Sequence, residues 1–420
     1  MNILTSENLN DYMHGFIEKI CEEIGPRESG TEEEMRAGDE IEAEMKKFCD
    51  ETHQEEYISS PHAFLGGIRY GAFLVFIAIV LYWIDFLIDL NIIPLDKGLG
   101  MVFLVCSIAL IILTVSYFIL EVMKYYEAYD FLFPKKKSKN IIGTINPSER
   151  ADKTIIFSAH HDSAFEFNTF YYLKRFGQII INVGYLAVGI VLIGIVLKFV
   201  FDLLNFKLPV LFLIFGILFA CFIPIILIYI LFHSYKPVLG AFDNLSGVSI
   251  VLGIGKYLNE HKTNDIFPKR TKVLLISFAG EESGLRGAKR YVEDHDEELK
   301  KTSTIIVNMD VIAKKNTLII LDKESGIGAK HDPKIYKPIY EIVKEMNPKA
   351  KIASLPFGAT DAAAFSKKGI PAASLGGLDL VSELAPYYHT RYDTPDVVEK
   401  EALGQMLELC VKYLKMIDKE

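Results

Sequence analysis

The chain has 420 residues, which is long enough for one large domain or two of ordinary size. Half of its residues are apolar, a high share for a purely soluble protein, so segments that cross a membrane are expected. The formal net charge of −9 and the lack of a basic cluster argue against nucleic-acid binding. The five cysteines are scattered without a Cys-x-x-Cys pair, which argues against a disulfide framework or a cysteine zinc site and fits a reducing compartment.

Two amphipathic helices are predicted near the N-terminus. Apolar residues recur at helical spacing from Tyr12 to Ile24, before the break Gly25-Pro26, and a second helix is expected from Thr31 to Phe48. The acidic residues Glu32–Glu34 are expected in a solvated first turn, where carboxylates interact favourably with the helix dipole. The sequence gives no reason to assign this turn a function.

Four apolar segments are long enough to cross a membrane, since about 20 helical residues span the ~30 Å hydrocarbon core. They are Gly71–Ile93, Met101–Leu120, Phe176–Leu197 and Leu208–Phe232. Each pair is separated by a short link, so two hairpins are predicted, and all the polar sequence should lie on one face of the membrane. Asp85 and Asp89 share one helix face and are expected at the far interface, where their carboxylates reach water.

This arrangement predicts one polar domain interrupted by two transmembrane hairpins. The polar parts are residues 1–66, 125–173 and 235–420, and the hairpins are 67–124 and 174–234. Lys and Arg gather on the polar-domain side of the spans, whereas the opposite loops offer only Lys97 and Lys207, with Lys198 near a helix end. The positive-inside rule therefore predicts a cytoplasmic polar domain, and the first 12 residues lack a signal-peptide pattern.

The polar sequence alternates between strand and helix patterns. Strands are predicted at Asn140–Ile145, Thr154–Phe157, Lys272–Phe278, Thr304–Met309, Thr317–Leu321 and Ala372–Leu375. Helices are predicted at Ser246–His261, Arg286–Glu293, Pro333–Met346, Ala362–Lys368 and from Pro395 to about Ile417. Such alternation predicts an α/β domain with a central mixed, mostly parallel sheet flanked by helices.

Several acidic and histidine residues stand at strand ends or turns, where ligands gather in open α/β sheets. They are His160 and Asp162, Asp243, Glu281 and Glu282, Asp310, and His389. Each alone has an ordinary explanation as a turn, helix-cap or surface residue, and His161 is left without a role. Together, two histidines and three carboxylates suit a pair of zinc ions with one bridging carboxylate. Asp162 is placed to hold the second ring nitrogen of His160.

The sequence resembles the di-zinc aminopeptidase family that includes bacterial leucyl aminopeptidases, glutamate carboxypeptidase and the peptidase-like domain of transferrin receptor. The matching stretches are Gly25–Gly30, Ala159–Ser163, Asp243–Gly247, Gly280–Gly284, Asn308–Asp310, Lys368–Ala372, Tyr388–Thr390 and Asp393-Thr394. The resemblance covers the polar sequence, about 300 residues, and leaves out the four apolar segments.

The resemblance implies a role for each position that matches the family's motifs. The implied ligands of two Zn²⁺ are Asp243 as the bridge, His160 and Asp310 on one ion, and Glu282 and His389 on the other. Asp162 would orient His160, Glu281 would be the general base for a water activated by the two metals, and Tyr388 would be a candidate to stabilise the oxyanion. The resemblance also implies a cis peptide bond between Asp243 and Asn244.

These features predict a multi-pass membrane metallopeptidase whose partners are a peptide substrate and the lipid bilayer. It is expected to be an aminopeptidase that removes N-terminal residues from peptides at or near the membrane. A carboxypeptidase or glutaminyl cyclase of the same family, and a transporter or binding protein with a peptidase-like domain, remain alternatives. The sequence carries no indication of an oligomeric state.

The chain segments that link the site to the second hairpin are short. About ten residues separate Phe232 from Asp243, and at ~3.3 Å per residue they reach at most roughly 35 Å. The site is therefore predicted to lie close to the bilayer surface, with the spans beside its entrance. The alternative is that the hairpins only anchor a peptidase of the soluble type.

Overall fold

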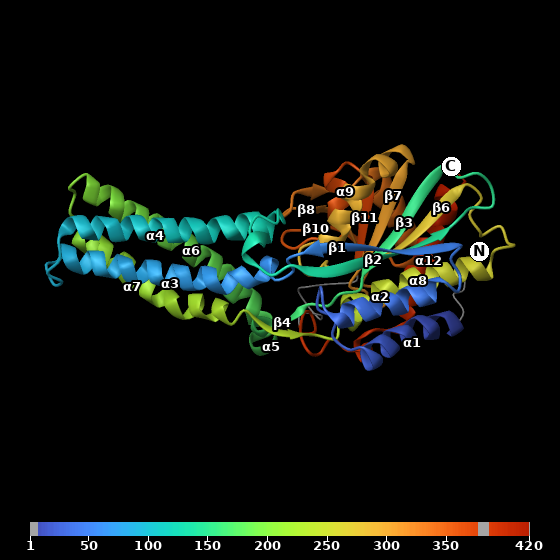
Figure 1. The fold of residues 1–420 in the computed structure, drawn as a ribbon, viewed down its shortest axis with the longest axis horizontal. Helices are drawn as coiled ribbons and strands as arrows, with labels where there is room; N and C mark the ends of the chain where they lie inside the picture. Colours follow the sequence, from blue (N-terminus) through green and yellow to red (C-terminus); the bar gives the residue numbers. More distant parts are fainter. Residues whose placement is uncertain (1–6, 377–385, 420) are drawn as a thin grey trace.

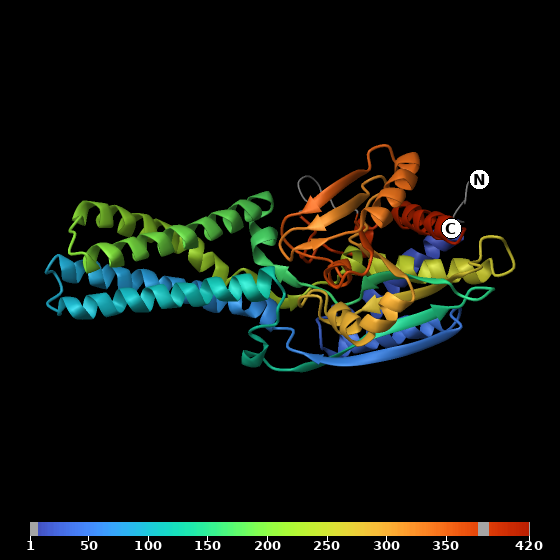
Figure 2. The same cartoon turned by 90° about the horizontal axis from the view of Figure 1, so that it is seen from above.

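The computed structural model describes residues 7–376 and 386–419. A bundle of four long helices projects from one end of a domain in which helices cover both faces of a β-sheet (Figures 1 and 2). The first helix, α1 (Glu7–Glu23), and the last, α12 (Lys400–Ile417), both belong to this domain and lie away from the bundle. The fold thus separates an apolar helical part from a mixed α/β part.

The central sheet has nine strands. They are β1 (Glu51–Ser59), β2 (Lys136–Ile145), β3 (Lys153–His160), β6 (Thr271–Phe278), β7 (Thr304–Asp310), β8 (Ile319–Glu324), β9 (Ala329–Lys330), β10 (Lys351–Leu355) and β11 (Ala372–Gly376). Their order is β1-β2-β6-β3-β7-β11-β8-β10, with β9 paired to β8. The predicted mixed sheet is confirmed. Parallel pairing joins β6, β3, β7 and β11 at the centre, but antiparallel pairs are as frequent as parallel ones.

Two hydrophobic layers cover the sheet because successive strand residues point to opposite faces. On one face, Ile155 and Leu275 pack with α1, α12, α8 (Ser246–Glu260) and α10 (Pro333–Met346). On the other, Ile156 and Ile276 pack with α9 (Arg286–Lys301) and α11 (Ala362–Lys367). These layers fix the central strands and therefore the positions of their carboxyl ends.

The predicted strands are all present, and the differences lie at the sheet edges and near the C-terminus. Strands β1 and β10 were not predicted, because β1 is largely polar, β10 has only five residues, and both edge strands are partly exposed and so lack a buried apolar run. The helix predicted from Pro395 begins instead at Lys400 as α12, after a single 3-10 turn at Pro395–Val397. The reason is that Val398 and Glu399 adopt extended backbone, which lets Val398 enter the core.

The acidic first turn of α2 (Glu32–Met45) is only partly solvated. Glu32 and Glu33 are exposed as predicted, but Glu34 is fully buried. Its Oε2 accepts hydrogen bonds from the backbone N–H of Gly30 at 2.6 Å and from the hydroxyl of Ser138 at 2.8 Å, and its Oε1 lies 3.4 Å from His161 Nε2. The prediction for Glu34 was wrong because its partners are distant in the sequence.

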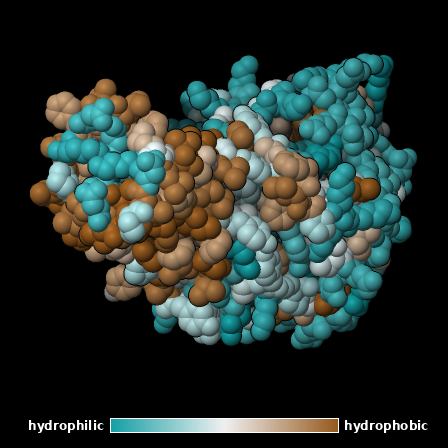
Figure 3. Space-filling view, turned by 60° about the vertical axis from the view of Figure 1, so that its left-hand side comes forward, coloured by the Kyte–Doolittle hydropathy of each residue, from teal (hydrophilic) through white to brown (hydrophobic). Residues whose placement is uncertain are grey.

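Four helices are long and apolar enough to cross a membrane, judged by length and composition. They are α3 (Ala63–Asp89), α4 (Lys97–Tyr117, continued by a π-helical turn over Phe118–Met123), α6 (Arg175–Leu203) and α7 (Pro209–Ile230). Figure 3 shows an apolar outer surface over these helices and a mostly hydrophilic surface over the α/β domain. The four helices coincide with the four predicted segments.

An ion-pair cluster joins the two hairpins near their free ends. Lys198 of α6 is fully buried, and its Nζ lies 2.6 Å from a carboxylate oxygen of each of Asp85, Asp89 and Asp202. Asp85 is 3% exposed, so the prediction that its carboxylate reaches water was wrong. The buried lysine of the neighbouring hairpin takes the place of water as its partner.

The roots of both hairpins are fixed to the α/β domain. At the first hairpin, Arg286 of α9 is 1% exposed, and its guanidinium lies 2.9 Å from Glu121 Oε1 and 2.6 Å from Asp130 Oδ2. At the second, the two chain ends meet in a small antiparallel ribbon of β4 (Phe165–Phe167) and β5 (His233–Pro237). The bundle is therefore attached by two rigid connections.

We expect Arg286→Met to destabilise the protein strongly. The substitution leaves the buried carboxylate of Glu121 without its cation, and such a loss costs about 3–5 kcal/mol of unfolding free energy. Denaturation of the detergent-solubilised protein, followed by circular dichroism, measures the change. Arg270→Met is the matched control, because its ion pair with Asp152 is exposed and should contribute about 0–1 kcal/mol. Equal losses in the two variants would contradict the assignment.

Candidate metal centre

The carboxyl ends of three central strands meet at one edge of the sheet and carry the predicted polar residues. His160 is the last residue of β3, Asp310 is the last of β7, and Glu281 and Glu282 follow β6. The other two residues come from loops: Asp243 stands just before α8, and His389 just before the Pro395 turn. Parallel pairing of β3 with β6 and β7 brings these segments to the same place.

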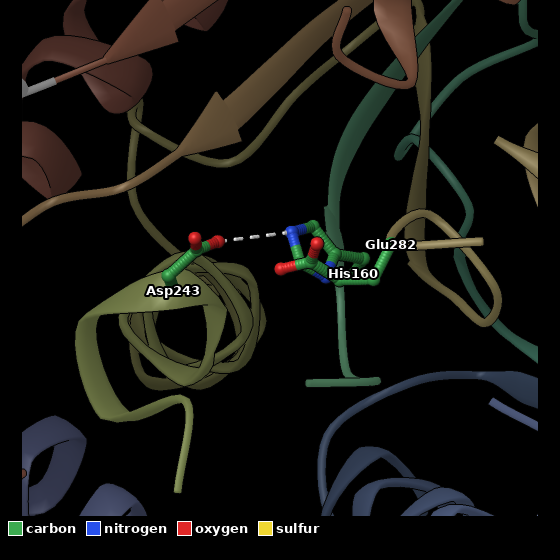
Figure 4. Close-up of side chains that lie close together, drawn as sticks. All are labelled: His160, Asp243 and Glu282. Carbon is green, nitrogen blue, oxygen red and sulfur yellow. Dashed lines mark ion pairs between the residues drawn. The ribbon is translucent and has the colours of Figure 1, made fainter. Parts of the chain in front are cut away.

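The structure brings all five predicted metal ligands together. Asp243 lies between the two histidines, with Oδ1 3.4 Å from His160 Nε2 and Oδ2 3.1 Å from His389 Nε2. Asp310 Oδ1 is 3.8 Å from His160 Nε2, and Glu282 Oε1 is 3.2 Å from His389 Nε2. Figure 4 shows His160, Asp243 and Glu282 pointing toward one another from separate segments. The geometry therefore divides the five residues into two groups that share Asp243.

The donor atoms of this cluster fit zinc. Imidazole nitrogens and carboxylate oxygens are zinc ligands, and one such atom from each of His160, Asp243 and Glu282 lies within 4.8 Å of the others. Within the described part of the chain, His160 Nε2, Asp243 Oδ2 and Glu282 Oε1 are buried without a hydrogen-bond partner. Buried polar atoms normally have a partner. A bound cation would give these three buried atoms the partner that they lack.

The electrostatics of the cluster also favour a cation. Burial raises the pKa of Glu282 to about 7, and the neighbouring carboxylate of Asp243 adds to this effect. Burial likewise raises the pKa of Glu281 well above its usual value, with contributions from Asp310 and Glu282. Burial opposes protonation of His389, yet the carboxylates of Glu282 and Asp243 raise its pKa to about 10. Negative charge is therefore in excess at this site.

Asp162 has more contacts than the sequence suggested. Its Oδ1 lies 3.4 Å from His160 Nδ1, as expected for a residue that orients the ring. Its two oxygens also accept hydrogen bonds from the backbone N–H groups of Glu281 and Glu282, each at 3.1 Å, and from the hydroxyl of Ser29 at 2.7 Å. This buried carboxylate connects the His160 strand to the turn that carries both glutamates.

Two further connecting residues were not assigned roles from the sequence. Asp393 accepts hydrogen bonds from the backbone N–H groups of Phe242, at 2.7 Å, and Asp243, at 3.3 Å. Asn244 donates to the carbonyl of Met309 at 2.9 Å and accepts from the N–H of Val311 at 3.3 Å, which ties the Asp243 loop to the end of β7. Both residues stand in stretches that match the family, and each is close in sequence to a predicted ligand. This closeness was the sequence feature that could have indicated their role.

The remaining predicted residues line the same space. Glu281 Oε2 lies 3.9 Å from His160 Nε2, and the ring of Tyr388 stacks on that of His389 with centroids 3.9 Å apart. The Asp243–Asn244 peptide bond is cis, as expected. Asp361, which ends the Phe357–Asp361 stretch expected around the specificity pocket but was not assigned a role of its own, is fully buried, and neither carboxylate oxygen has a hydrogen-bond partner among the described residues.

Comparisons with known proteins agree with this site. Residues 229–414 match peptidase family M28. The aminopeptidase YwaD of Bacillus subtilis is 28% identical over 180 residues, which cover 40% of this chain and 36% of that protein. A zinc aminopeptidase structure from Bacillus subtilis aligns with a TM-score of 0.54 and 15% identity over 97% of this chain and 95% of that one. A glutaminyl cyclase structure from Bacteroides thetaiotaomicron aligns with a TM-score of 0.55 and 13% identity over 97% of each chain.

The family match covers most of the cluster. It contains Asp243, Glu282, Asp310 and His389, whereas His160 lies before it. The structural neighbours, at low identity, extend the agreement to the fold of the whole α/β domain, including β3, which carries His160. Residues 229–414 therefore match peptidase family M28, and the similarities to an aminopeptidase and to zinc aminopeptidase structures support the resemblance of the sequence to the di-zinc aminopeptidase family.

Proposed function

We propose that the chain is an integral-membrane, zinc-dependent aminopeptidase. The observation that carries the proposal is the clustering of two histidines and three carboxylates around Asp243, with one further glutamate left uncommitted beside them. In this proposal Asp243 would be the ligand common to two zinc ions. His160 and Asp310 would hold one ion, and Glu282 and His389 would hold the other. Zinc, when bound, supplies a Lewis acid that polarises the scissile carbonyl and lowers the pKa of water.

Glu281 is the general base of the proposed reaction. It stands next to Glu282 in the chain, yet its carboxylate has no place in either ligand group. Asp162 fixes the backbone of both glutamates, so one side chain can be committed to metal while the other moves a proton. Burial raises the pKa of Glu281, which suits a carboxylate that takes a proton from water and returns it to the leaving amine.

Tyr388 is the proposed donor to the oxyanion. Its ring stacks on His389, which keeps it beside the second ligand group. Burial, together with the carboxylates of Asp243 and Glu282, raises the pKa of Tyr388 well above the usual value of a tyrosine. The hydroxyl therefore keeps its proton and is able to donate a hydrogen bond to developing negative charge.

The charge around the cluster favours an aminopeptidase over a carboxypeptidase. Among the described residues, every ion pair of the five ligand residues is made with a histidine and none with Lys or Arg. Asp361 adds a buried carboxylate without a partner. Two bound zinc ions would offset the charge of the three ligand carboxylates, so Asp361, which is not a ligand in this proposal, is the group that would attract a substrate's α-ammonium group and repel a free α-carboxylate.

The four apolar helices are proposed to cross the bilayer as two hairpins. The peptidase domain then comprises residues 1–66, 125–173 and 235–420, interrupted by hairpins at 67–124 and 174–234, and it lies on the cytoplasmic side. The apolar outer surface of the helices supports this proposal, as does the concentration of Lys and Arg on the peptidase side. Both hairpin roots are attached to the domain, which keeps the catalytic site near the membrane surface.

Hydrolysis by the detergent-purified, zinc-loaded protein tests the proposed activity. We expect release of the N-terminal residue from peptides with a free amine, no release from N-blocked peptides, and loss of activity with a chelator. Glu281→Gln should lower kcat by about 10²–10⁴-fold at unchanged zinc content, because it removes the base. Glu297→Gln, on the exposed face of α9, is the control. Activity retained in Glu281→Gln would refute the assigned base, and cyclisation of N-terminal glutamine without hydrolysis would indicate a cyclase.

Asp162→Asn is expected to weaken zinc binding by about 10–100-fold, the usual effect of losing a residue that orients a metal ligand. The amide keeps the shape of the side chain but has only one acceptor oxygen. It therefore cannot accept hydrogen bonds from the N–H groups of both Glu281 and Glu282 and also face His160 with an oxygen. Competition with a chromophoric chelator measures the affinity. Asp265→Asn is the control because that side chain is 94% exposed. An affinity equal to that of the unmodified protein would contradict the role.

Zinc binding is expected to release protons. The raised pKa values of His160 and His389 mean that both imidazoles carry protons at neutral pH before a metal binds, and zinc requires them neutral. Zinc binding should therefore release protons at pH 7.5, from the imidazoles and in part from Glu282, whose pKa burial raises to about 7, and the apparent affinity should fall as the pH is lowered. Calorimetric titration in two buffers with different ionisation enthalpies measures the number of protons released. A binding heat independent of the buffer would contradict the prediction.

A further inference from the structure

A buried glutamate holds the loop that ends at Asp361. Glu324 is the last residue of β8 and is fully buried. Its Oε2 accepts a hydrogen bond from the backbone N–H of Thr360, and its Oε1 accepts one from the Thr360 hydroxyl, each at 2.8 Å. Thr360 directly precedes Asp361 in the chain. The glutamate therefore fixes the backbone from which the Asp361 side chain extends.

His331 holds the carboxylate of Glu324 from a second direction. Its Nε2 lies 2.9 Å from Glu324 Oε1, and its Nδ1 lies 2.9 Å from the hydroxyl of Ser366 in α11. All of Glu324 and nearly all of His331 are buried, and burying a carboxylate costs free energy unless its oxygens have hydrogen-bond partners. Because hydrogen bonds to an ionised acceptor are the stronger kind, these residues form a rigid unit that is tied to α11 at both of its ends.

The first part of the loop before Asp361 is held more loosely. Residues 356–360 form neither helix nor strand, and Phe357 is 51% exposed. The ring of Phe357 lies 6.2 Å from that of Tyr185 in α6, which is near the upper limit for an aromatic pair. The two hydrogen bonds that Thr360 donates are therefore the contacts that fix the end of this loop.

Asp361 itself lies near the proposed general base. Burial is the main cause of the raised pKa of Glu281, and the charge of Asp361 adds to it, so the two carboxyl groups are close in space. Both carboxylate oxygens of Asp361 are buried and have no hydrogen-bond partner among the described residues, whereas buried polar atoms normally have one. An ammonium group would be a partner of matching charge, and its presence would favour the ionised form of Asp361.

We propose that Glu324 is a positioning residue for substrate recognition: acting through Thr360, it holds Asp361 where that carboxylate receives the α-ammonium group of the substrate. The inference rests on the proposed function and names the residues that set its requirement for a free N-terminus. Glu324 touches neither the metal ligands nor the substrate in this arrangement. A glutamate that only stabilised the fold would not affect how well the protein distinguishes two ligands that differ in the amine alone, whereas the proposed role requires such an effect.

The test measures the binding of two hydroxamates to the full chain, purified in detergent and loaded with zinc. Leucine hydroxamate and 4-methylpentanoic hydroxamate share the side chain and the zinc-binding group, but only the first has an α-amine. The ratio of their dissociation constants, measured by calorimetry at equal zinc content, therefore isolates the contribution of the amine. In the unmodified protein we expect the amine to strengthen binding by about tenfold or more, as for other hydrogen bonds to charged groups.

Glu324→Met has a similar volume but no acceptor for the Thr360 donors, and it should reduce this factor to about threefold or less. Glu324→Gln should keep most of the factor, because its amide can accept from the Thr360 N–H and donate to the Thr360 hydroxyl. An equal loss in both variants would show that the charge of Glu324 acts directly and would overturn the positioning role. Asp322→Asn is the control, since Asp322 lies on the same strand but accepts an exposed hydrogen bond from Ser354.

Variants of Thr360 remain informative if Glu324→Met folds poorly. Thr360→Val removes the hydroxyl at nearly constant volume and should lower the factor by about threefold, whereas Thr360→Ser keeps the hydroxyl and should leave it unchanged. An undiminished factor in Thr360→Val and in any folded Glu324→Met would overturn the inference, as would equal binding of the two hydroxamates by the unmodified protein. If the unmodified protein binds neither hydroxamate and hydrolyses no peptide with a free amine, the proposed function itself fails.

Discussion

The repulsion among buried carboxylates at the candidate metal centre is the constraint on which the surrounding structure depends. Three polar side chains oppose it by holding the ligand-bearing loops in place. Asp162 and Asp393 accept hydrogen bonds from backbone N–H groups of neighbouring loops, and Asn244 joins the Asp243 loop to the end of β7. These hydrogen bonds fix backbone, and Asp162 also orients the ring of His160 from its Nδ1 side, so the ligand atoms that face the centre stay free to bind a cation. Metal binding and the order of these loops are therefore coupled.

The hairpins enter the domain at the same loops. Phe64 and Tyr125, at the two ends of the first hairpin, pack against Gly284, which stands beside the turn that carries Glu281 and Glu282. The packing is close, because a Cβ added to Gly284 would lie 3.1 Å from the Phe64 ring and 3.5 Å from the Tyr125 ring. Phe167, at the start of the second hairpin, donates its N–H to the carbonyl of His389 at 2.7 Å and packs its ring against that histidine. A change in the tilt of either hairpin would therefore act directly on a ligand loop.

The clustering of the candidate ligand residues could be predicted from the sequence because several of them follow strands with a buried apolar run, such as β3 and β6. What could not be predicted are contacts between residues distant in the chain. Glu34 is buried against Ser138 and His161, although the acids beside it indicate a solvated turn. Asp85 lies in an apolar segment, but its local sequence does not show that its partner is Lys198 of the other hairpin. The edge strands β1 and β10 escaped prediction for a related reason, since partly exposed strands produce no continuous apolar pattern.

The ion pairs at both ends of the bundle argue that the hairpins do more than anchor the chain. One apolar helix is enough to hold a domain at a membrane. Here, in addition, Lys198 is buried among three carboxylates at the free end of the bundle, and Arg286 is buried against Glu121 at its root. Removing such charges from water costs free energy, and their best-attested use is to fix the register of packed helices. A bundle of fixed register holds both hairpin roots, and the ligand loops that contact them, in fixed positions, which a simple tether does not require.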